Sequence, residues 1–258
     1  MDLQIKGLRV LVTAGANGIG RATARAFAAE GAKVHICDVD TAALAEMAKS
    51  DPAMTQSVCD VSDREAVARL MGDALAALGG LDCLVNNAGI AGPTGRVDEI
   101  DPADWDTCVA IDLTGQFNCT RLAVQHLKQS KNASIVNLSS QAGKHGFPLR
   151  SPYAAAKWGV IGFTKALSAE LGEFGIRANA ICPGLVEGPR IQSVIANKAR
   201  SFNVSHEEMT ERLFAGVSIK QFVDPADIAK QIVFLASPFA KTISGQEFSV
   251  CGDTRMLA

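Results

Sequence analysis

Short apolar runs rich in β-branched residues alternate with longer alanine-rich segments along most of the chain. The apolar runs of strand length are 8–14, 33–38, 55–60, 81–87, 134–140 and 176–184. The segments with apolar residues at helical spacing are 20–31, 41–50, 63–79 and 153–175. The strands lack strict in-out alternation, which is typical of a parallel sheet buried on both faces. Strands separated by helix-length segments predict right-handed crossovers and an α/β fold with a doubly wound sheet.

No linker, charge block or internal repeat divides the 258 residues, so we expect a single domain over 1–258. The apolar segment 245–253 suits a final strand. The alternation is interrupted at 90–101 and at 185–221, and the second region holds two segments of helical character. Ligands of such sheets bind beyond the carboxyl ends of the strands. We therefore expect residues of about 185–221 to form a substrate loop or lid.

Composition and charge narrow the class of protein. The formal net charge is -2 and the basic residues are scattered, so no electrostatic footprint for nucleic acid is present. The N-terminal residues lack a signal-peptide pattern, and the apolar runs fall short of the roughly 20 residues of a membrane helix. Seven dispersed cysteines and four lone histidines show neither CxxC nor HxxxH spacing. We expect a cytoplasmic protein with core thiols, no metal and no membrane partner.

The first predicted junction between a strand and a helix reads TAGANGIG, residues 13–20. Glycines at a turn let backbone N–H groups approach a phosphate, and the following helix N-terminus supplies positive potential. A tight turn alone would also explain a glycine triplet. The position between a strand and a helix in the first βαβ unit favours a nucleotide-phosphate site. The candidate residues are Gly15, Asn17, Gly18, Ile19 and Gly20.

Asp38 ends the second predicted strand, 18 residues past Gly20. An acid at about this offset accepts hydrogen bonds from the adenosine ribose hydroxyls and repels the 2′-phosphate of NADP. Val39 and Asn17 offer no positive charge that would compensate. We therefore predict NAD as the cofactor. The alternative is that Asp38 caps the next helix, a role that Asp40 can also fill.

Several short motifs follow one another along the chain: TAGANGIG at 13–20, CDV at 59–61, NNAG at 86–89, Ser140, YAAAK at 153–157, PG at 183–184 and SGQ at 244–246. In this order and spacing the chain resembles the short-chain dehydrogenase/reductase family essentially end to end. The resemblance implies a Rossmann-type subunit with cofactor and substrate sites in one domain, and a homotetramer. It further implies three sets of cofactor contacts: adenine at Asp60 and Val61, the central groove at Asn87, Ala88 and Gly89, and nicotinamide at Pro183, Gly184 and Val186.

Tyr153, the only tyrosine of the chain, stands four residues before Lys157. This spacing puts both side chains on one face of a helix. Oxidation of an alcohol requires a base, and free tyrosine ionises only near pH 10, but a neighbouring ammonium favours the phenolate. An isolated pair of this kind is commonly a solvent-facing one. With the cofactor motifs, the pattern predicts Tyr153 as acid/base, Lys157 as its partner and a ligand of the nicotinamide ribose, and Ser140, which family spacing selects over Ser139, as the hydroxyl that holds the substrate oxygen.

Three positions depart from the family pattern. Ala14 replaces the first glycine of the turn, a change that we expect to be tolerated. Asp112 stands where the resemblance implies the asparagine of a catalytic tetrad, whose main-chain carbonyl holds a relay water. We include Asp112 among the catalytic residues, and its carboxylate needs a partner if it is buried. Glu187 replaces a threonine that often contacts the nicotinamide carboxamide.

The candidate substrate residues are Gln141, His145, Arg150 and Arg190. Arginine binds carboxylates bidentately, so we hypothesise a small-molecule substrate that is a sugar acid or a 2-keto-3-deoxy sugar acid. Equally, the two arginines can face water or a neighbouring subunit. The alternatives among enzymes are a 3-oxoacyl thioester reductase and a dehydrogenase of neutral sugars or polyols. Outside enzymes, the alternative is a nucleotide-sensing protein that retains the Rossmann frame.

Overall fold

The computed structural model describes residues 2–257 and contains one seven-stranded sheet. The strands are β1 (Arg9–Thr13), β2 (Lys33–Asp38), β3 (Thr55–Val58), β4 (Cys83–Asn86), β5 (Ser134–Leu138), β6 (Arg177–Pro183) and β7 (Glu247–Val250). Their order is β3-β2-β1-β4-β5-β6-β7, and every neighbouring pair is parallel. The predicted fold class, a single-domain doubly wound α/β sheet, is confirmed. The strand order reverses between β1 and β4, which is where such sheets bind ligands.

The helices of the described residues are α1 (Gly18–Ala29), α2 (Thr41–Ser50), α3 (Arg64–Leu78), α4 (Pro102–Val109), α5 (Gly115–Leu127), α6 (Ser151–Leu171), α7 (Pro189–Phe202), α8 (His206–Ala215) and α9 (Pro225–Ala236). Several begin at an acceptor side chain: Asp63, Asp101 and Asp224 each accept a backbone N–H of the following turn, which satisfies an otherwise unpaired donor. The pattern predicted no element at residues 225–236, which form α9. Among residues 2–257, no helix combines the length and apolar character that crossing a bilayer requires.

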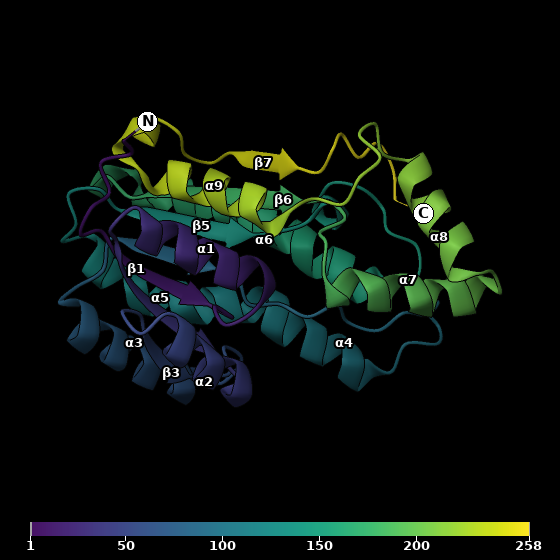
Figure 1. Cartoon of the computed structure of the whole chain (residues 1–258), viewed down its shortest axis with the longest axis horizontal. Coiled ribbons are helices and arrows are strands. Elements are labelled where there is room, and N and C mark those ends of the chain that lie inside the picture. The colour runs from purple at the N-terminus through teal and green to yellow at the C-terminus, as the bar shows by residue number, and fades with distance from the viewer. Residues whose placement is uncertain (1, 258) are drawn as a thin grey trace.

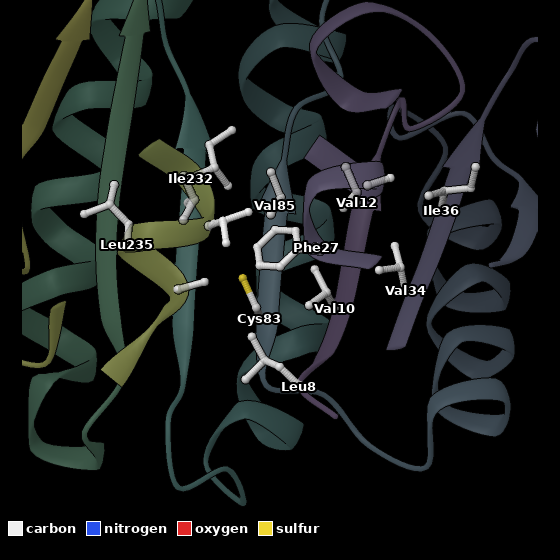
Figure 2. Packing of buried hydrophobic residues seen from close by; sticks show 14 of the residues in the cluster. Leu8, Val10, Val12, Phe27, Val34, Ile36, Cys83, Val85, Ile232 and Leu235 are labelled. Atoms are coloured by element: carbon white, nitrogen blue, oxygen red, sulfur yellow. The ribbon is translucent and has the colours of Figure 1, made fainter. Parts of the chain in front are cut away.

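One face of the sheet packs against α1, α2 and α9. Figure 2 shows Phe27 of α1 between the β1 residues Val10 and Val12 and the α9 residues Ile232 and Leu235, all of them buried. Helices α1 and α9 lie side by side on this face (Figure 1). Burial of each such side chain contributes roughly 1.5–3 kcal/mol relative to exposure, so this layer stabilises the strands that end at the site.

The opposite face packs against α3, α5 and α6. The buried residues on this face include Leu11 of β1 and Leu84 of β4, whose neighbours along each strand point to the opposite face. They lie in one cluster with Leu70 of α3, Leu127 of α5 and Leu167 of α6. Successive strand residues thus alternate between two buried faces. This explains why the sequence shows continuous apolar runs where a half-exposed sheet would show alternation.

Helices α7 and α8 form a unit beyond the carboxyl ends of the strands, at the end to which the arrows point in Figure 1. Their buried side chains form a separate small cluster of Leu185, Ile195, Met209, Leu213 and Val217. The two helical segments predicted inside 185–221 are therefore present. This cluster is distinct from the two cores of the sheet.

Candidate active site

The turn after β1 leaves the N-terminus of α1 without a side-chain cap. Asn17 occupies the cap position, but its side-chain amide donates to Asp40 Oδ2 at 3.3 Å. Gly18 has φ +50° and its Cα faces open space, where a backbone can approach a ligand. A Cβ on Gly20 would lie 2.6 Å from Asn87 Nδ2, so this glycine serves the close packing of α1. Unpaired N–H groups at a helix N-terminus are suited to bind a phosphate.

Asp38, at the end of β2, is 8 % exposed and lies beside this turn. Its Oδ2 accepts the Ala16 N–H at 3.1 Å, and its Oδ1 accepts the Asp40 N–H at 3.1 Å. Asp40 is the residue that caps α2, through the Ala43 N–H at 2.9 Å. Asp38 is therefore free of the capping role, and a carboxylate has lone pairs left for ribose hydroxyls after these two bonds.

The segment after β4 is tied directly to the turn of residues 13–20 that follows β1, the predicted phosphate turn. Asn87 Nδ2 donates to the carbonyls of Thr13 and Ala14 at 3.0 Å each, and the Asn87 and Ala88 N–H groups donate to Thr13 Oγ1 at 2.9 Å. Asn87 therefore holds the segment after β4 against the turn after β1. Gly89 follows two residues later, and a side chain at this position would point toward Asp112 and Lys157.

The remaining predicted cofactor residues lie at the same edge of the sheet. Asp60 is exposed and its Oδ1 accepts both the N–H and the hydroxyl of Ser62, at 2.8 and 2.7 Å. Val61 is buried and its carbonyl accepts Asn118 Nδ2 at 3.0 Å. Beyond β6, Pro183 ends the strand, Gly184 donates to the Val250 carbonyl at 3.0 Å and Val186 pairs with Val223. Glu187 beside them is exposed, and its backbone N–H donates to the Val223 carbonyl at 3.0 Å.

Ala14 takes a left-handed conformation, with φ 47°. A residue with a Cβ is disfavoured there by roughly 1–2 kcal/mol relative to an unstrained conformation. The departure from glycine that we expected to be tolerated is thus accommodated, but with backbone strain at the phosphate turn.

Tyr153 and Lys157 lie one turn apart near the start of α6. The Lys157 ammonium is 5.6 Å from the centre of the Tyr153 ring and donates to the Leu138 carbonyl, at the end of β5, at 3.0 Å. Lys157 is 4 % exposed, whereas the Tyr153 side chain is only partly buried. The pair is therefore anchored to the carboxyl end of the sheet and does not face bulk solvent, as the surface-pair alternative would require.

Two neighbouring serines follow β5, and their contacts separate them. The Ser139 hydroxyl is buried and donates to the Lys157 carbonyl at 2.8 Å, which ties the strand end to α6. Ser140 is half-buried and its Oγ accepts the Ala142 N–H at 3.1 Å, so its hydroxyl proton remains available. The geometry favours Ser140 over Ser139 as the donor to a substrate oxygen.

Asp112 lies in a π-helical turn, Ala110–Thr114, inserted between α4 and α5. Such single turns recur at functional sites. The Asp112 side chain is fully buried, and its Oδ1 accepts the Ile90 N–H at 2.7 Å, the partner that a buried carboxylate needs. Burial raises the pKa of this carboxyl, against the opposing charge of Lys157 and the bond from Ile90. A Cβ on Gly89 would lie 2.7 Å from Asp112 Oδ1 and 3.2 Å from Lys157 Nζ. The Asp112 and Lys157 side chains therefore both approach the backbone at Gly89.

The four predicted substrate residues have different surroundings. Gln141 is buried, and its Nε2 donates to the Cys182 carbonyl and to Ser249 Oγ at 2.9 Å, so it supports the β6–β7 edge. His145 is half-buried in the loop after β5. Arg190, at the start of α7, is exposed and donates to the Gly89 carbonyl at 2.6 Å.

Arg150 is nearly fully buried, 2 % exposed, with its guanidinium carbon 5.0 Å from the centre of the Tyr153 ring. The alternative in which it faces bulk water is therefore wrong for the chain in this structure. Sequence reasoning missed Lys198 of α7, which is fully buried with its ammonium 4.3 Å from the centre of the Phe147 ring. The available signal was its spacing, since Lys198 shares the apolar face of α7 with Val194 and Ile195.

A nicotinamide dinucleotide fits this set of residues. The uncapped start of α1 suits the pyrophosphate, and Asp38 at the end of β2 suits a ribose. The arrangement brings the Tyr153 phenol, the Lys157 ammonium and the Ser140 hydroxyl together at the same edge of the sheet. It is therefore suited to hydride transfer to or from a carbon that bears oxygen.

Comparison with protein families agrees with this chemistry. The family model described as enoyl-(acyl carrier protein) reductase matches residues 13–252. The chain is 34% identical over 254 residues to a 3-oxoacyl-[acyl-carrier-protein] reductase of Thermotoga maritima, covering 97% of this chain and 98% of that protein. It is 37% identical over 246 residues to a cis-4-hydroxycyclohexanecarboxylate dehydrogenase of Sinomonas cyclohexanicum, covering 94% of each.

A solved structure shows the same architecture. The actinorhodin polyketide ketoreductase with NADPH superposes with a TM-score of 0.89 at 35% identity, covering 94% of this chain and 95% of that one. The similarity thus extends over nearly the whole chain in both sequence and structure.

Proposed function

The chain belongs to the short-chain dehydrogenase/reductase family, and on that premise we propose that it is an NAD-dependent enzyme that interconverts a secondary alcohol and a ketone on a small hydroxy acid. Members of this family are oxidoreductases of hydroxyl and keto groups that use a nicotinamide cofactor. The observation that carries the proposal is the Tyr153–Lys157 pair of α6, anchored at the end of β5 beside Ser140.

In the proposed mechanism, a nicotinamide cofactor held at this site would supply or accept the hydride. Ser140 donates a hydrogen bond to the substrate oxygen and orients it toward Tyr153. Tyr153 removes the proton of the alcohol in oxidation, or returns it to the developing alkoxide in reduction. The Lys157 ammonium, held by the Leu138 carbonyl, lies 5.6 Å from the centre of the Tyr153 ring and supplies positive charge beside the proton transfer. Asp112 keeps the Ile90 backbone in position beside them and completes the proposed catalytic set.

The preference for NAD rests on Asp38. Its carboxylate lies at the end of β2 beside the phosphate turn, where it would accept ribose hydroxyls and repel a 2′-phosphate. The similar ketoreductase structure holds NADPH, so cofactor choice in this family differs from one member to another. Comparison of kcat/KM with NAD and with NADP tests this part directly.

For the substrate we propose a sugar acid or a 2-keto-3-deoxy sugar acid. Buried or partly buried cations near Tyr153 support an acid, as does the relative whose name includes a carboxylate. The second candidate is a 3-oxoacyl thioester, which the Thermotoga maritima relative favours by its name. The third candidate substrate is a neutral sugar or polyol.

The deciding experiment is NADH formation by the purified protein, screened over sugar acids, neutral polyols and hydroxyacyl thioesters. Turnover confined to acids supports the proposed substrate. Turnover of thioesters alone would contradict it and support the second candidate, a 3-oxoacyl thioester. The Tyr153→Phe variant should lose roughly 10²–10⁴ in kcat while still binding NADH, because only the proton transfer is removed. Unchanged kcat would contradict the assignment of Tyr153.

We also propose a homotetramer in the cytoplasm, and a substrate lid formed by residues 185–221. Exposed aromatic side chains on α5 and α6, Phe117 and Trp158, support an interface on that face. Light scattering coupled to size exclusion measures the number of subunits, and a monomer that is fully active would contradict the tetramer.

A further inference from the structure

Asp112, in the π-helical turn between α4 and α5, receives a donor at each carboxylate oxygen. The Ile90 N–H donates to Oδ1 at 2.7 Å, and the Cys108 thiol donates to Oδ2 at 3.8 Å. The Asp112 side chain is fully buried. An asparagine, which the family resemblance implies at this place, would accept the Ile90 N–H equally well through its side-chain oxygen. The bond to Ile90 therefore does not explain why an ionisable group stands here.

A buried carboxylate is unfavourable unless positive groups compensate its charge. Among residues 2–257, no direct ion pair includes Asp112. Burial accordingly raises the pKa of its carboxyl, although the charges of Lys157 and Arg190 and the bonds from the Ile90 N–H and the Cys108 thiol act in the opposite direction. A neutral amide of the same shape would avoid this unfavourable burial. A purely structural role therefore does not account for the carboxylate.

The packing at Gly89 brings Asp112 toward Lys157 of α6. A Cβ on Gly89 would lie 2.7 Å from Asp112 Oδ1 and 3.2 Å from Lys157 Nζ, so only a glycine leaves room for both groups. The Lys157 ammonium also donates to the Leu138 carbonyl at 3.0 Å. A carbonyl bond and the attraction of a buried carboxylate together restrict where this ammonium lies.

The Cys108 thiol, in the last turn of α4, is built into the same packing. Gly92 has φ +69°, and a Cβ there would lie 2.8 Å from Cys108 Sγ, so this glycine makes room for the thiol. Burial and the charge of Asp112 raise the pKa of Cys108 to about 12, so the group remains a protonated donor. The other charged groups that act on the two side chains are Lys157 and Arg150 on the side of α6, and Arg190 of α7.

We propose that Asp112 and Cys108 are positioning residues for Lys157: the Asp112 carboxylate holds the ammonium in place by its charge, and the Cys108 thiol holds the carboxylate. The proposal rests on the proposed function, because the place of Lys157 affects turnover only if Lys157 acts with Tyr153. It gives the Asp112 side chain a role that the main-chain carbonyl of an asparagine would not supply. The effective form is the carboxylate, so the contribution is lost when Asp112 binds a proton.

The test compares Asp112→Asn with the wild type, because asparagine keeps the shape of the side chain and the acceptor for the Ile90 N–H but removes the charge. The substrate is the one most rapidly oxidised among the sugar acids, neutral polyols and hydroxyacyl thioesters. At neutral pH we expect kcat to fall roughly tenfold or more, with KM changed less than about threefold. The ratio of wild-type to variant kcat should approach one as the pH falls, because Asp112 then becomes protonated in the wild type.

The melting temperature gives a second measurement, which needs neither substrate nor cofactor. The native carboxyl has a raised pKa and so releases its proton at a higher pH than the unfolded chain does. Stability of the wild type is therefore lost as the pH rises through this interval. Asp112→Asn should melt at a higher temperature than the wild type near neutral pH, and the difference should disappear toward acid. Lower activity combined with higher stability is the result that a structural role would not give.

Two substitutions of Cys108 test the second half of the proposal. Cys108→Ala removes the donor to Asp112 and should raise the pKa of the carboxyl further, so the pH at which kcat declines should move upward. Cys108→Ser keeps a donor and should stay close to the wild type. The controls are Cys119→Ala, which removes another buried thiol, and Asp106→Asn, which removes an exposed carboxylate of α4. Both should leave the pH dependence of kcat unchanged.

The possible outcomes separate the positioning role from the proposed function. If the wild type oxidises none of these substrates, the proposed function fails, and the role in positioning Lys157 fails with it. If the wild type is active and Asp112→Asn has the same kcat at every pH, the proposed function stands and the positioning role is refuted. A kcat lowered by one factor at every pH, together with a lower melting temperature, would also refute it, because the loss would then reflect packing. If Asp112→Asn does not fold, identical pH profiles for Cys108→Ala and Cys108→Ser would overturn the proposal.

Discussion

The replacement of Asp38 by asparagine tests cofactor selection at a single side chain. In the structure each carboxylate oxygen of Asp38 already accepts one backbone N–H, from Ala16 and from Asp40, both at 3.1 Å. The lone pairs that remain would accept the two ribose hydroxyls of NAD. Asparagine keeps the shape of the side chain but replaces one acceptor by a donor and removes the charge.

The expected magnitude follows from the strength of these bonds. Hydrogen bonds to a charged acceptor contribute about 1.5–3 kcal/mol, against about 0.5–1.5 kcal/mol for neutral partners. Loss of about 1 kcal/mol for each of two hydroxyls amounts to about 2 kcal/mol, or roughly 30-fold in kcat/KM with NAD. Use of NADP should rise, because the carboxylate no longer repels its 2′-phosphate.

The assay measures initial rates with both cofactors at fixed ionic strength, together with the melting temperature of each variant. Asp40→Asn is the control, since Asp40 carries a carboxylate two residues away but caps α2. It should shift stability slightly and leave the ratio of kcat/KM for NAD to that for NADP within about threefold. An unchanged ratio in a folded Asp38→Asn variant would show that Asp38 does not select the cofactor.

Three further substitutions or conditions test other parts of the structure. Gly89→Ala should reduce kcat at least about tenfold, because its Cβ would meet Asp112 Oδ1 at 2.7 Å and Lys157 Nζ at 3.2 Å; wild-type rates would contradict this packing. Ala14→Gly should raise the free energy of unfolding by about 0.5–1 kcal/mol, because the backbone strain that is relieved exceeds the cost of the greater chain entropy of glycine in the unfolded state. Denaturant titration should detect this increase. Burial lowers the pKa of His35 to about 4, so below pH 6.5 the unfolded chain binds a proton that the native state does not. Stability should therefore fall by about 3 kcal/mol between pH 6.5 and 4, and His35→Gln should show a smaller fall over that interval.

The sequence by itself determined the strands, their parallel pairing and the glycine-containing turn after β1. These features depend on local periodicity and on spacing along the chain, which the residues carry directly. The pairing of Tyr153 with Lys157 belongs to the same class, because four residues make one turn of any helix. The seven strands and the helices of 185–221 lie where the pattern predicted them, whereas α4, α5 and α9 lie outside the helical segments that the pattern indicated.

Tertiary structure decided which of several equivalent side chains reach the site. Ser139 and Ser140 are indistinguishable by residue type, and only the contact of Ser139 with the Lys157 carbonyl separates them. Asp40 caps α2 and leaves Asp38 beside the phosphate turn. These outcomes depend on neighbours distant in the chain.

The same holds for charge. Arginine and lysine are usually exposed, so the sequence could not distinguish a solvated Arg150 from a buried one, nor bring Lys198 next to it. Burial is a property of the faces that meet when α7 covers the end of the sheet, and it depends on the packing of the whole fold. Local spacing therefore specified the strands and the pairing of Tyr153 with Lys157, and long-range packing specified which charged side chains are buried near them.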